Sequence, residues 1–449
     1  MRILKLLGLI IAAVLASLLA ALGLWHLLDG TPSPAAPVPM KARFDGELMV
    51  LVDGDMSATA YADGRLHRVE GAQDLLMRLP TGGAEAATLA RVSNTVMGWP
   101  GATEVVGDAV FVVESRGSAP ADVEVAMPSV YEGLPFGTRL QRIDRATGTV
   151  DAMEVCTQPL SVDAAPGGDW LLVACGDDDG EIAVVPISGD GMNAVRRFDL
   201  DLPRLPGRPW DAGAGYAVVH PDGRAAAVLS ANTGLTLVRF ALDANGVPVA
   251  AQAEDTLVTD GYLSVARWSN MGAYLLVADV GWGAAPTDAL FNRAGSIRSY
   301  ALDPRNSKRG EVGRASVGKS PEAFEMDRGG TLLAVVNMER TYLPGGALSL
   351  VPGRASSSLS LVAFDPKTGG LTTLGAPVGF RGVLPEDAVF DADGDALAVV
   401  VYQDHDAPRS DGWLAFFDID RSGPVPVARL TDRRVALPRG GHDLVVIDP

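Results

Sequence analysis

Two segments from opposite ends of the chain complete one another: His442-Asp-Leu-Val-Val-Ile-Asp-Pro449 and Phe44-Asp-Gly-Glu-Leu-Met-Val-Leu-Val52. An intact copy of the unit that they form lies at residues 385–401, where an apolar strand, an Asp/Gly turn and a second apolar strand follow in order. The C-terminal segment supplies the first strand of that unit, and the N-terminal segment supplies its turn and second strand. A chain whose end completes its own beginning forms a closed ring.

The same unit recurs along the chain with a turn glycine in each copy, and the glycines lie at Gly46, Gly107, Gly168, Gly223, Gly272, Gly330 and Gly394. Self-similarity of this kind is typical of propellers and solenoids. Each unit has a second half with two further strands around a polar turn, as at 359–374. Four strands in each of seven units predict an all-β, seven-bladed β-propeller over residues 42–449, whose first blade the C-terminal strand completes. A β-sandwich or a pair of barrels is the alternative, because short, regularly spaced strands suit those folds too.

An apolar run of 23 residues at 6–28 follows Arg2 and Lys5. About twenty such residues span a bilayer, and positive flanks stay cytoplasmic. Residues 1–29 are therefore predicted to be a single-pass membrane anchor, with a cleaved signal segment as the alternative. The Pro-rich linker at 30–41 is an extended spacer. We expect the propeller on the periplasmic side of the cytoplasmic membrane, or secreted to the periplasm if the segment is cleaved.

The charge and the motifs exclude several classes of function. A formal net charge of −18 argues against nucleic acid as a partner, because nucleic acid attracts basic surfaces. No P-loop and no dinucleotide-binding Gly-x-Gly-x-x-Gly opens a helix, so no cofactor is predicted. The run Asp177-Asp-Asp-Gly-Glu181 offers oxygen ligands for Ca²⁺ without matching a full calcium loop, which leaves Asp177 and Asp179 as weak metal candidates.

The chain has two cysteines, Cys156 and Cys175. Cys156 precedes the first strand of the third unit, and Cys175 ends the second strand of the same unit. Both positions belong to the propeller face that carries the blade-to-blade crossovers. An even number of cysteines in an oxidising compartment permits a disulfide, and two unpaired buried thiols are the alternative.

Two of the units, residues 318–337 and 219–232, resemble the YVTN-type repeats of the lactonase-like seven-bladed propeller superfamily. The resemblance covers most of residues 44–449 and lies mainly in structural positions: the Asp-Gly turn, the apolar alternation and the Asn that ends a strand. Members include 6-phosphogluconolactonase-like hydrolases, so the resemblance implies a lactonase-like hydrolase as one possible activity. Those hydrolases carry Pro-His-x-His motifs at the channel mouth, and this sequence has no such doublet.

A polar pattern repeats at the start of the innermost strand in three consecutive units, in Lys319-Ser-Pro-Glu322, Arg381-Gly-Val-Leu-Pro-Glu386 and Arg439-Gly-Gly-His442. Innermost strands converge on the central channel, so these side chains are expected to share its mouth. The bases would hold a polar or anionic ligand, and Glu322, Glu386 and His442 are the candidates for proton transfer. The alternative is a hydrated set of charges that neutralise each other.

Long insertions fall on the same crossover face, at 114–137, 279–295, 337–358 and 402–412. They carry residue types that are common at binding sites, including Trp282 and Arg340, which we add to the ligand-binding candidates. The sequence thus predicts a membrane-tethered, non-enzymatic propeller that binds a protein or a small polar or anionic ligand through its loop face and channel mouth. A lactonase-like hydrolase that uses the channel-mouth Glu/Arg/His cluster is the alternative.

Overall fold

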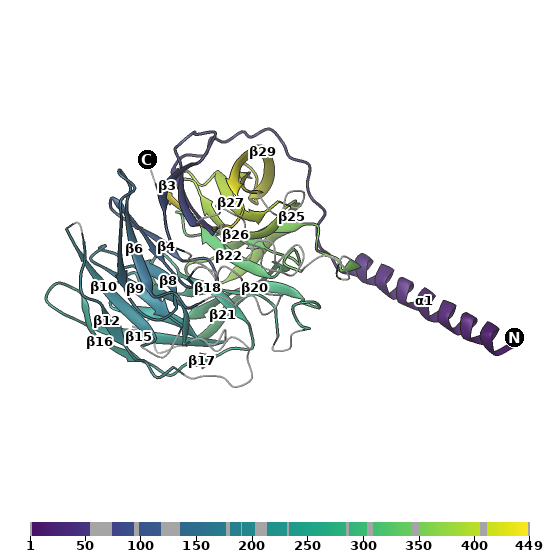
Figure 1. Ribbon diagram of the computed structural model, residues 1–449, viewed down its shortest axis with the longest axis horizontal. Helices are drawn as coiled ribbons and strands as arrows, with labels where there is room; N and C mark the ends of the chain where they lie inside the picture. The colour runs from purple at the N-terminus through teal and green to yellow at the C-terminus, as the bar shows by residue number, and fades with distance from the viewer. Residues whose placement is uncertain are drawn as a thin grey trace.

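The computed structural model describes residues 2–53, 74–93, 98–117, 135–176, 180–189, 191–202, 213–230, 233–283, 287–302, 309–343, 348, 350–404 and 411–447. Within them the strands form seven antiparallel sheets arranged as the blades of a propeller (Figure 1). The innermost strands pack in ring order, and the innermost strand of the last blade packs against that of the first. The predicted all-β, seven-bladed propeller is confirmed.

The blades are numbered along the chain, and the strands of each blade run from the innermost outward. Blades 1 and 2 contain β30 (Gly441–Ile447), β1 (Glu47–Asp53), β2 (Asp74–Leu79) and β3 (Ala87–Arg91), then β4 (Thr103–Val106), β5 (Ala109–Val113), β6 (Arg139–Asp144) and β7 (Val150–Glu154). Blade 3 contains β8 (Pro159–Ala164), β9 (Trp170–Cys175) and β10 (Ile182–Ser188), and β10 pairs with both β11 (Gly191–Met192) and β12 (Arg196–Phe198). Blade 4 contains β13 (Ala214–Val219), β14 (Ala225–Ser230), β15 (Gly234–Leu242) and β16 (Pro248–Ala253), with β17 (Leu257–Val258) paired to β15.

The remaining three blades follow the same order. Blade 5 contains β18 (Leu263–Trp268), β19 (Leu275–Asp279), β20 (Ala294–Ala301) and β21 (Gly310–Lys319). Blade 6 contains β22 (Pro321–Met326), β23 (Leu332–Asn337), β24 (Ser357–Phe364) and β25 (Leu371–Phe380). Blade 7 contains β26 (Val383–Phe390), β27 (Ala396–Gln403), β28 (Asp411–Asp420) and β29 (Val427–Pro438).

The ring closes through blade 1, where the C-terminal strand β30 pairs antiparallel with β1. The register places Leu48 opposite Val446 and Val50 opposite Leu444. The C-terminal strand is thus the innermost strand of the first blade, as the sequence predicts. All seven predicted turn glycines have positive φ, from 56° at Gly107 to 140° at Gly46, a conformation that glycine adopts at no steric cost.

The burial pattern of the strands explains why the sheets stack face to face as blades. The second strands are buried on both faces, as in β27, where every residue from Ala396 to Gln403 is buried. Neighbouring blades cover these faces, which explains the continuous apolar runs in the sequence. The outermost strand β29 alternates buried and exposed residues because only one of its faces packs on a neighbour.

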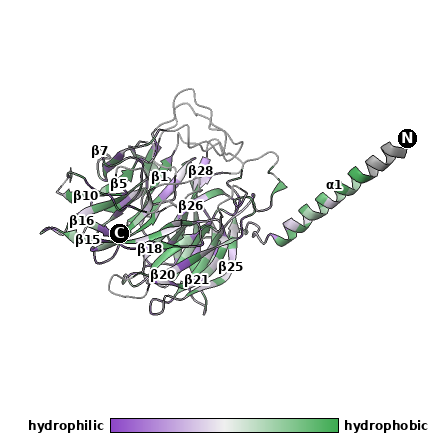
Figure 2. Cartoon of the chain, turned by 90° about the horizontal axis from the view of Figure 1, so that it is seen from below, coloured by the Kyte–Doolittle hydropathy of each residue, from purple (hydrophilic) through white to green (hydrophobic). Residues whose placement is uncertain are grey.

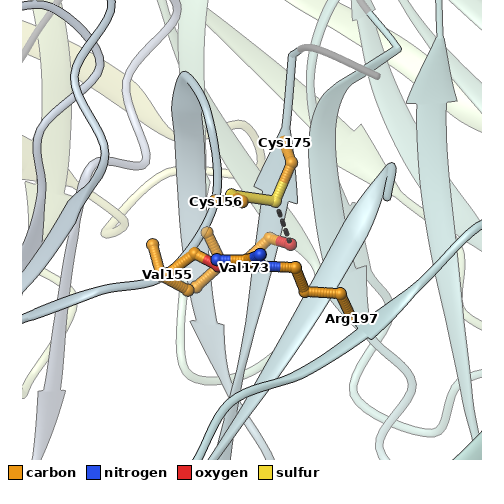
Figure 3. Close-up of a disulfide and its surroundings, with 5 residues drawn as sticks. All are labelled: Val155, Cys156, Val173, Cys175 and Arg197. Carbon is orange, nitrogen blue, oxygen red and sulfur yellow. Dashed lines mark hydrogen bonds between the residues drawn. A yellow bond between two sulfur atoms is a disulfide. The ribbon is translucent and has the colours of Figure 1, made fainter. Parts of the chain in front are cut away.

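A disulfide joins Cys156 and Cys175, with the two Cα atoms 6.1 Å apart (Figure 3). It ties the segment between β7 and β8 to the end of β9. Arg197 lies beside it, and its Nε donates a hydrogen bond of 2.7 Å to the carbonyl oxygen of Val155. The bridge therefore fastens the junction of blades 2 and 3, and the predicted pairing is confirmed.

The apolar helix α1 (Arg2–Leu28) projects away from the propeller (Figures 1 and 2). Its residues 10–28 are long and apolar enough to cross a membrane. The spacer that follows does not hang free, because its backbone bonds to the outer strands of blades 6 and 7. The amide of Ala35 donates to the carbonyl of Gly379 at 2.8 Å, and the amide of Val38 donates to the carbonyl of Leu430 at 2.9 Å.

Candidate functional site

A cavity of about 670 Å³ occupies the central channel. Every innermost strand contributes one ionisable side chain to its lining, and we call these seven residues the channel ring: Glu104, Asp163, Tyr216, Arg267, Glu325, Asp387 and Asp443. Five of the seven are carboxyl groups and one is a guanidinium. Cavities of a few hundred Å³ with a few convergent polar groups are the usual form of a small-molecule site.

Backbone amides of the neighbouring blades hold the ring carboxylates in place. Asp163 accepts a hydrogen bond of 2.6 Å from the amide of Val219. Asp443 accepts one of 2.7 Å from the amide of Thr103, and Asp387 accepts one of 3.1 Å from the amide of Leu444. Arg267 forms an ion pair with Glu325. Each contact crosses from one blade to the next, so the groups are fixed by the ring itself.

Burial and mutual repulsion raise the pKa values of the ring carboxyls. Burial, and then the charge of Asp163, raise the pKa of Glu104 to about 8. Burial raises the pKa of Asp163 to about 6, although the amide of Val219 and the charge of Arg267 oppose the shift. The pKa of Asp387 lies well above its ordinary value because of burial and the nearby Asp443. At neutral pH Glu104 therefore carries a proton, whereas Asp163 is largely ionised.

An aromatic layer lies across the crossover end of the channel, where the outer strand of each blade connects to the inner strand of the next. It consists of Trp99, Tyr262, Trp282 and Tyr342. Trp99 precedes β4 in blade 2 and contacts Tyr262, which precedes β18 in blade 5, with ring centroids 6.1 Å apart. Trp282 touches Trp99 and Tyr342 at centroid distances of 6.4 and 5.3 Å. Because blades 2 and 5 lie on opposite sides of a seven-membered ring, these contacts span the channel.

The other end of the channel, the turn end, carries the turn glycines and leads into the cavity. Pro221, Ser269 and Asn270, from the turns that follow β13 and β18, belong to the cavity lining. The same lining includes Val446 and Ile447 at the end of β30. The geometry thus gives the cavity an approach from the turn end, opposite the long loops.

Three of the predicted site residues do converge, and we call Glu322, Glu386 and His442 the acid–histidine group. Nδ1 of His442 lies 3.4 Å from Oε2 of Glu386, and Glu386 in turn shares a hydrogen bond with Glu322. All three side chains are buried. Burial, and then the charge of Glu386, hold the pKa of Glu322 well above its usual range, so Glu322 is protonated and donates to Glu386.

The acid–histidine group has spare hydrogen-bonding capacity. Oε2 of Glu322 and Nε2 of His442 are buried without a hydrogen-bond partner among the residues that the structure describes. The group is not part of the cavity lining. Arg439 is buried as well, and its charge lowers the pKa of the Tyr402 hydroxyl, which burial raises well above its usual value.

The other predicted ligand-binding residues lie elsewhere. Lys319 and Arg340 form ion pairs with Asp29, at 3.3 Å and 2.6 Å, and these three residues form what we call the Asp29 latch. Trp282 belongs to the aromatic layer and donates from Nε1 to Oγ of Ser320 at 2.9 Å. Arg381 is exposed, outside the buried acid–histidine group. Lys319 and Arg340 are therefore held at the start of the linker, because Asp29 pairs with both of them.

Two sets of predicted residues cannot be placed. The weak metal candidates Asp177 and Asp179 lie outside the described residues, as do most of the 114–137 insertion and residues 405–410. Within the part of the chain that the structure describes, no group of three or more His, Cys, Asp or Glu side chains is arranged to hold a metal ion.

The channel ring itself was not predicted, although the sequence carries a signal for it. Six of the seven ring residues lie at an odd spacing before the turn glycine of their unit: Glu104 lies three before Gly107, Asp163 five before Gly168 and Asp387 seven before Gly394. Residues at odd distances from the same point of a strand lie on one face of it, because successive side chains point to opposite faces. Because the spacing varies from three to seven residues, an alignment on the glycines places the ring residues in different columns, and only their shared strand face marks them as a set.

The fold is shared with known seven-bladed propellers. No family model matches the chain, and no curated protein sequence matches it. A 6-phosphogluconolactonase-like protein from Bacteroides fragilis superposes with a TM-score of 0.58 at 12% identity, over 91% of this chain and 100% of that chain. A similar protein from Bacteroides uniformis gives a TM-score of 0.57 at 12% identity, over 90% and 99%. A Lactobacillus plantarum protein gives 0.56 at 13% identity, over 90% and 100%. These similarities confirm the seven-bladed propeller fold.

Proposed function

We propose that this protein is a membrane-tethered binding propeller whose channel ring holds a small, positively charged ligand on the periplasmic side. The observation that carries the proposal is the ring, in which each of the seven innermost strands directs one ionisable side chain into a single cavity. Five carboxyl groups face one guanidinium there, and that guanidinium is already paired with Glu325. Glu104 carries a proton at neutral pH, but Asp163 is largely ionised, so the cavity still favours a cation.

The tether and the compartment rest on two features. The apolar helix α1 suits a single-pass anchor, and the Cys156–Cys175 disulfide suits an oxidising compartment. The Asp29 latch favours a retained anchor over a cleaved signal. Cleavage that removed Asp29 would leave Arg340, a side chain only 2% exposed, without its counter-charge.

The small polar or anionic ligand that the sequence predicts loses two of its expected contacts. Lys319 and Arg340 both pair with Asp29 and are not part of the cavity lining. A protein partner at the crossover loops stays a prediction. We place the small-ligand site at the channel ring because its charge and its approach from the turn end both suit a cation.

The test is calorimetric titration of the full-length protein in detergent with small diamines and guanidines, and with dicarboxylates of matched size. We expect the cations to bind and the dicarboxylates to give no heat. Asp163→Asn removes a charge but keeps an acceptor for the Val219 amide, and should weaken cation binding about tenfold, as loss of a charged hydrogen bond does. Asp420→Asn, an acid outside the lining, is the matched control and should leave the affinity unchanged.

Proton release sharpens the same titration. A bound cation lowers the pKa of Glu104, which carries a proton at neutral pH, so binding should expel that proton. The measured enthalpy should then depend on the ionisation enthalpy of the buffer, and Glu104→Gln should reduce this dependence. Equal binding of dicarboxylates, or cation binding that is indifferent to Asp163→Asn, would contradict the proposal.

A hydrolase is the second candidate, and the acid–histidine group is the observation that favours it. Oε2 of Glu322 and Nε2 of His442 have free hydrogen-bonding capacity, and Glu386 links the two residues. A panel of lactones and esters assayed with wild type and Glu386→Gln decides between the candidates. A binding protein gives no turnover, whereas turnover that Glu386→Gln abolishes would establish the hydrolase.

A further inference from the structure

The C-terminal end of α1 is built into the crossover loops of blades 5 and 6. The ring of Trp25 stacks on that of Phe291 with centroids 5.3 Å apart, and Nε2 of His26 lies 2.8 Å from the carbonyl oxygen of Leu350. Phe291 belongs to the connection between β19 and β20, and Leu350 to the connection between β23 and β24. The helix therefore ends in contact with two loops that are distant in the sequence.

The Asp29 latch fixes this junction immediately after the helix. The Asp29 and Arg340 side chains are 3% and 2% exposed, and their ion pair measures 2.6 Å. Thr31 donates a further hydrogen bond to Asp29. Burial alone would raise the pKa of Asp29, but the Thr31 hydrogen bond and the two bases together lower it. The buried ion pairs of the latch therefore restrict rotation of the propeller relative to α1.

The loops at this junction expose apolar side chains. Phe291 and Leu350 are each 62% exposed, and Arg293 beside Phe291 is exposed as well. A helix rises 1.5 Å per residue, so a loop that touches Trp25 lies within about one turn of the helix end. Aromatic rings and basic side chains at that depth are typical of the membrane interface. On a surface that faces only water, exposed apolar side chains such as Phe291 and Leu350 would gain nothing from the solvent.

We infer that Phe291 and Leu350, together with Trp25, form a membrane-contacting edge that inserts into the interfacial layer of the bilayer that α1 crosses. This inference rests on the proposed anchoring role of α1. The edge belongs to the crossover end of the propeller, so the turn end, with its approach to the cavity, is directed toward solvent. The latch and the edge together make the propeller a docked domain with a set orientation, not one free to tumble on its linker.

The experiment places a fluorophore at single cysteines and measures its quenching by brominated lipids in nanodiscs. Both native cysteines are in the disulfide, so an introduced cysteine is selectively labelled. The test positions are Phe291→Cys and Leu350→Cys in the full-length protein. The matched control is Met271→Cys, a position 79% exposed in the turn between β18 and β19, at the opposite end of the propeller.

We expect bromolipid quenching at positions 291 and 350 to exceed that at position 271 by at least about twofold, with reduced quenching by soluble iodide. Equal bromolipid quenching at 291 and 271 would overturn the inference. A label at 291 that is shielded from both quenchers would assign the edge to another protein or a second copy, and would overturn it too.

Two further measurements separate this inference from the proposed function. Alkaline carbonate extraction tests whether α1 is integrated into the membrane. Release of the protein would contradict both the anchoring role of α1 and the membrane-contacting edge. Retention of the protein without quenching at 291 and 350 would contradict the membrane-contacting edge alone. Arg340→Met opens the latch and also removes the contact of Arg340 with the Trp25 ring and its hydrogen bonds to the carbonyl oxygens of Asn292 and Pro352, but it leaves the side chains of α1 and of the loop tips in place. In a variant whose circular dichroism matches wild type, quenching at 291 should fall while carbonate resistance is kept. Unchanged quenching in that variant would show that the latch does not set the orientation.

Discussion

The two ends of the channel are built for different tasks. The crossover end is closed by the aromatic layer, contains the buried acid–histidine group and is locked to the linker through Asp29. The turn end has short glycine turns and leads to a cavity lined by acids. Long loops suggested that the crossover end binds a ligand, yet the described parts of those loops pack against the helix junction and one another. Loop length alone therefore does not identify a binding face. Loop side chains that already pack against other parts of the protein are not available to a ligand.

The largest expected effect comes from removing β30, because this strand serves both ends of the channel. Truncation after Pro438 removes His442 from the acid–histidine group and Asp443 from the channel ring, and exposes the paired edge of β1. We predict a loss of several kcal/mol, a large share of the roughly 5–15 kcal/mol typical of a native protein. A thermal melt measures it. A control truncated after Ile447 keeps the whole strand and should melt like the full chain; equal melting of both truncations would show that the ring closes otherwise.

Asp29→Ala tests the crossover end alone. It leaves Arg340 without its carboxylate partner in a buried site, which should cost about 3 kcal/mol. Chemical denaturation in detergent measures the loss. The solvent-accessible pair of Arg429 and Asp420 supplies the control, because Asp420→Ala should cost much less than Asp29→Ala. Similar costs for the two alanine variants would mean that the latch is not a structural element.

Stability should change with pH in opposite directions at the two ends of the channel. At the channel ring, Glu104 has a folded-state pKa of about 8, above its ordinary 4.5, so its contribution is complete below about pH 4.5 and is lost as pH rises toward 8. At the latch, the pKa of Asp29 is lowered, so its contribution is lost as pH falls through and below its ordinary value of 3.8. We expect the melting temperature to peak near pH 4–5 and to fall by pH 8. The ring side chains face a cavity that admits water, so the fall should correspond to only about 1–2 kcal/mol.

Glu104→Gln should flatten the alkaline side of that profile and leave the acid side unchanged, whereas Asp29→Asn should do the reverse. Thermal melts at one-unit pH intervals for both variants measure this. A Glu104→Gln protein that keeps the full loss between pH 5 and pH 8 would show that another group causes it.

Features that repeat locally could be predicted from the sequence. Ring closure follows from a strand–turn–strand pattern that each unit shows alone, and the disulfide follows from two cysteines in a single unit. Glu322, Glu386 and His442 were found because they hold similar places in consecutive units. The latch could not be predicted, since Asp29 and Arg340 are 311 residues apart and nothing local marks them as partners. Lys319 and Arg340 were therefore assigned to a ligand. The channel ring was overlooked because each acid, taken singly, resembles an ordinary polar residue near a turn.

The most direct test of the account is the charge selectivity of the channel. Ala323 on β22 lines the cavity, and Ala323→Cys offers a single thiol there. We predict that a positively charged thiol reagent modifies this cysteine at least about tenfold faster than a negatively charged one of the same size, because the channel ring concentrates cations. The preference should shrink when Asp163→Asn is added. Equal rates for the two reagents, or faster modification by the negative one, would contradict the claim that the channel ring is a cation site.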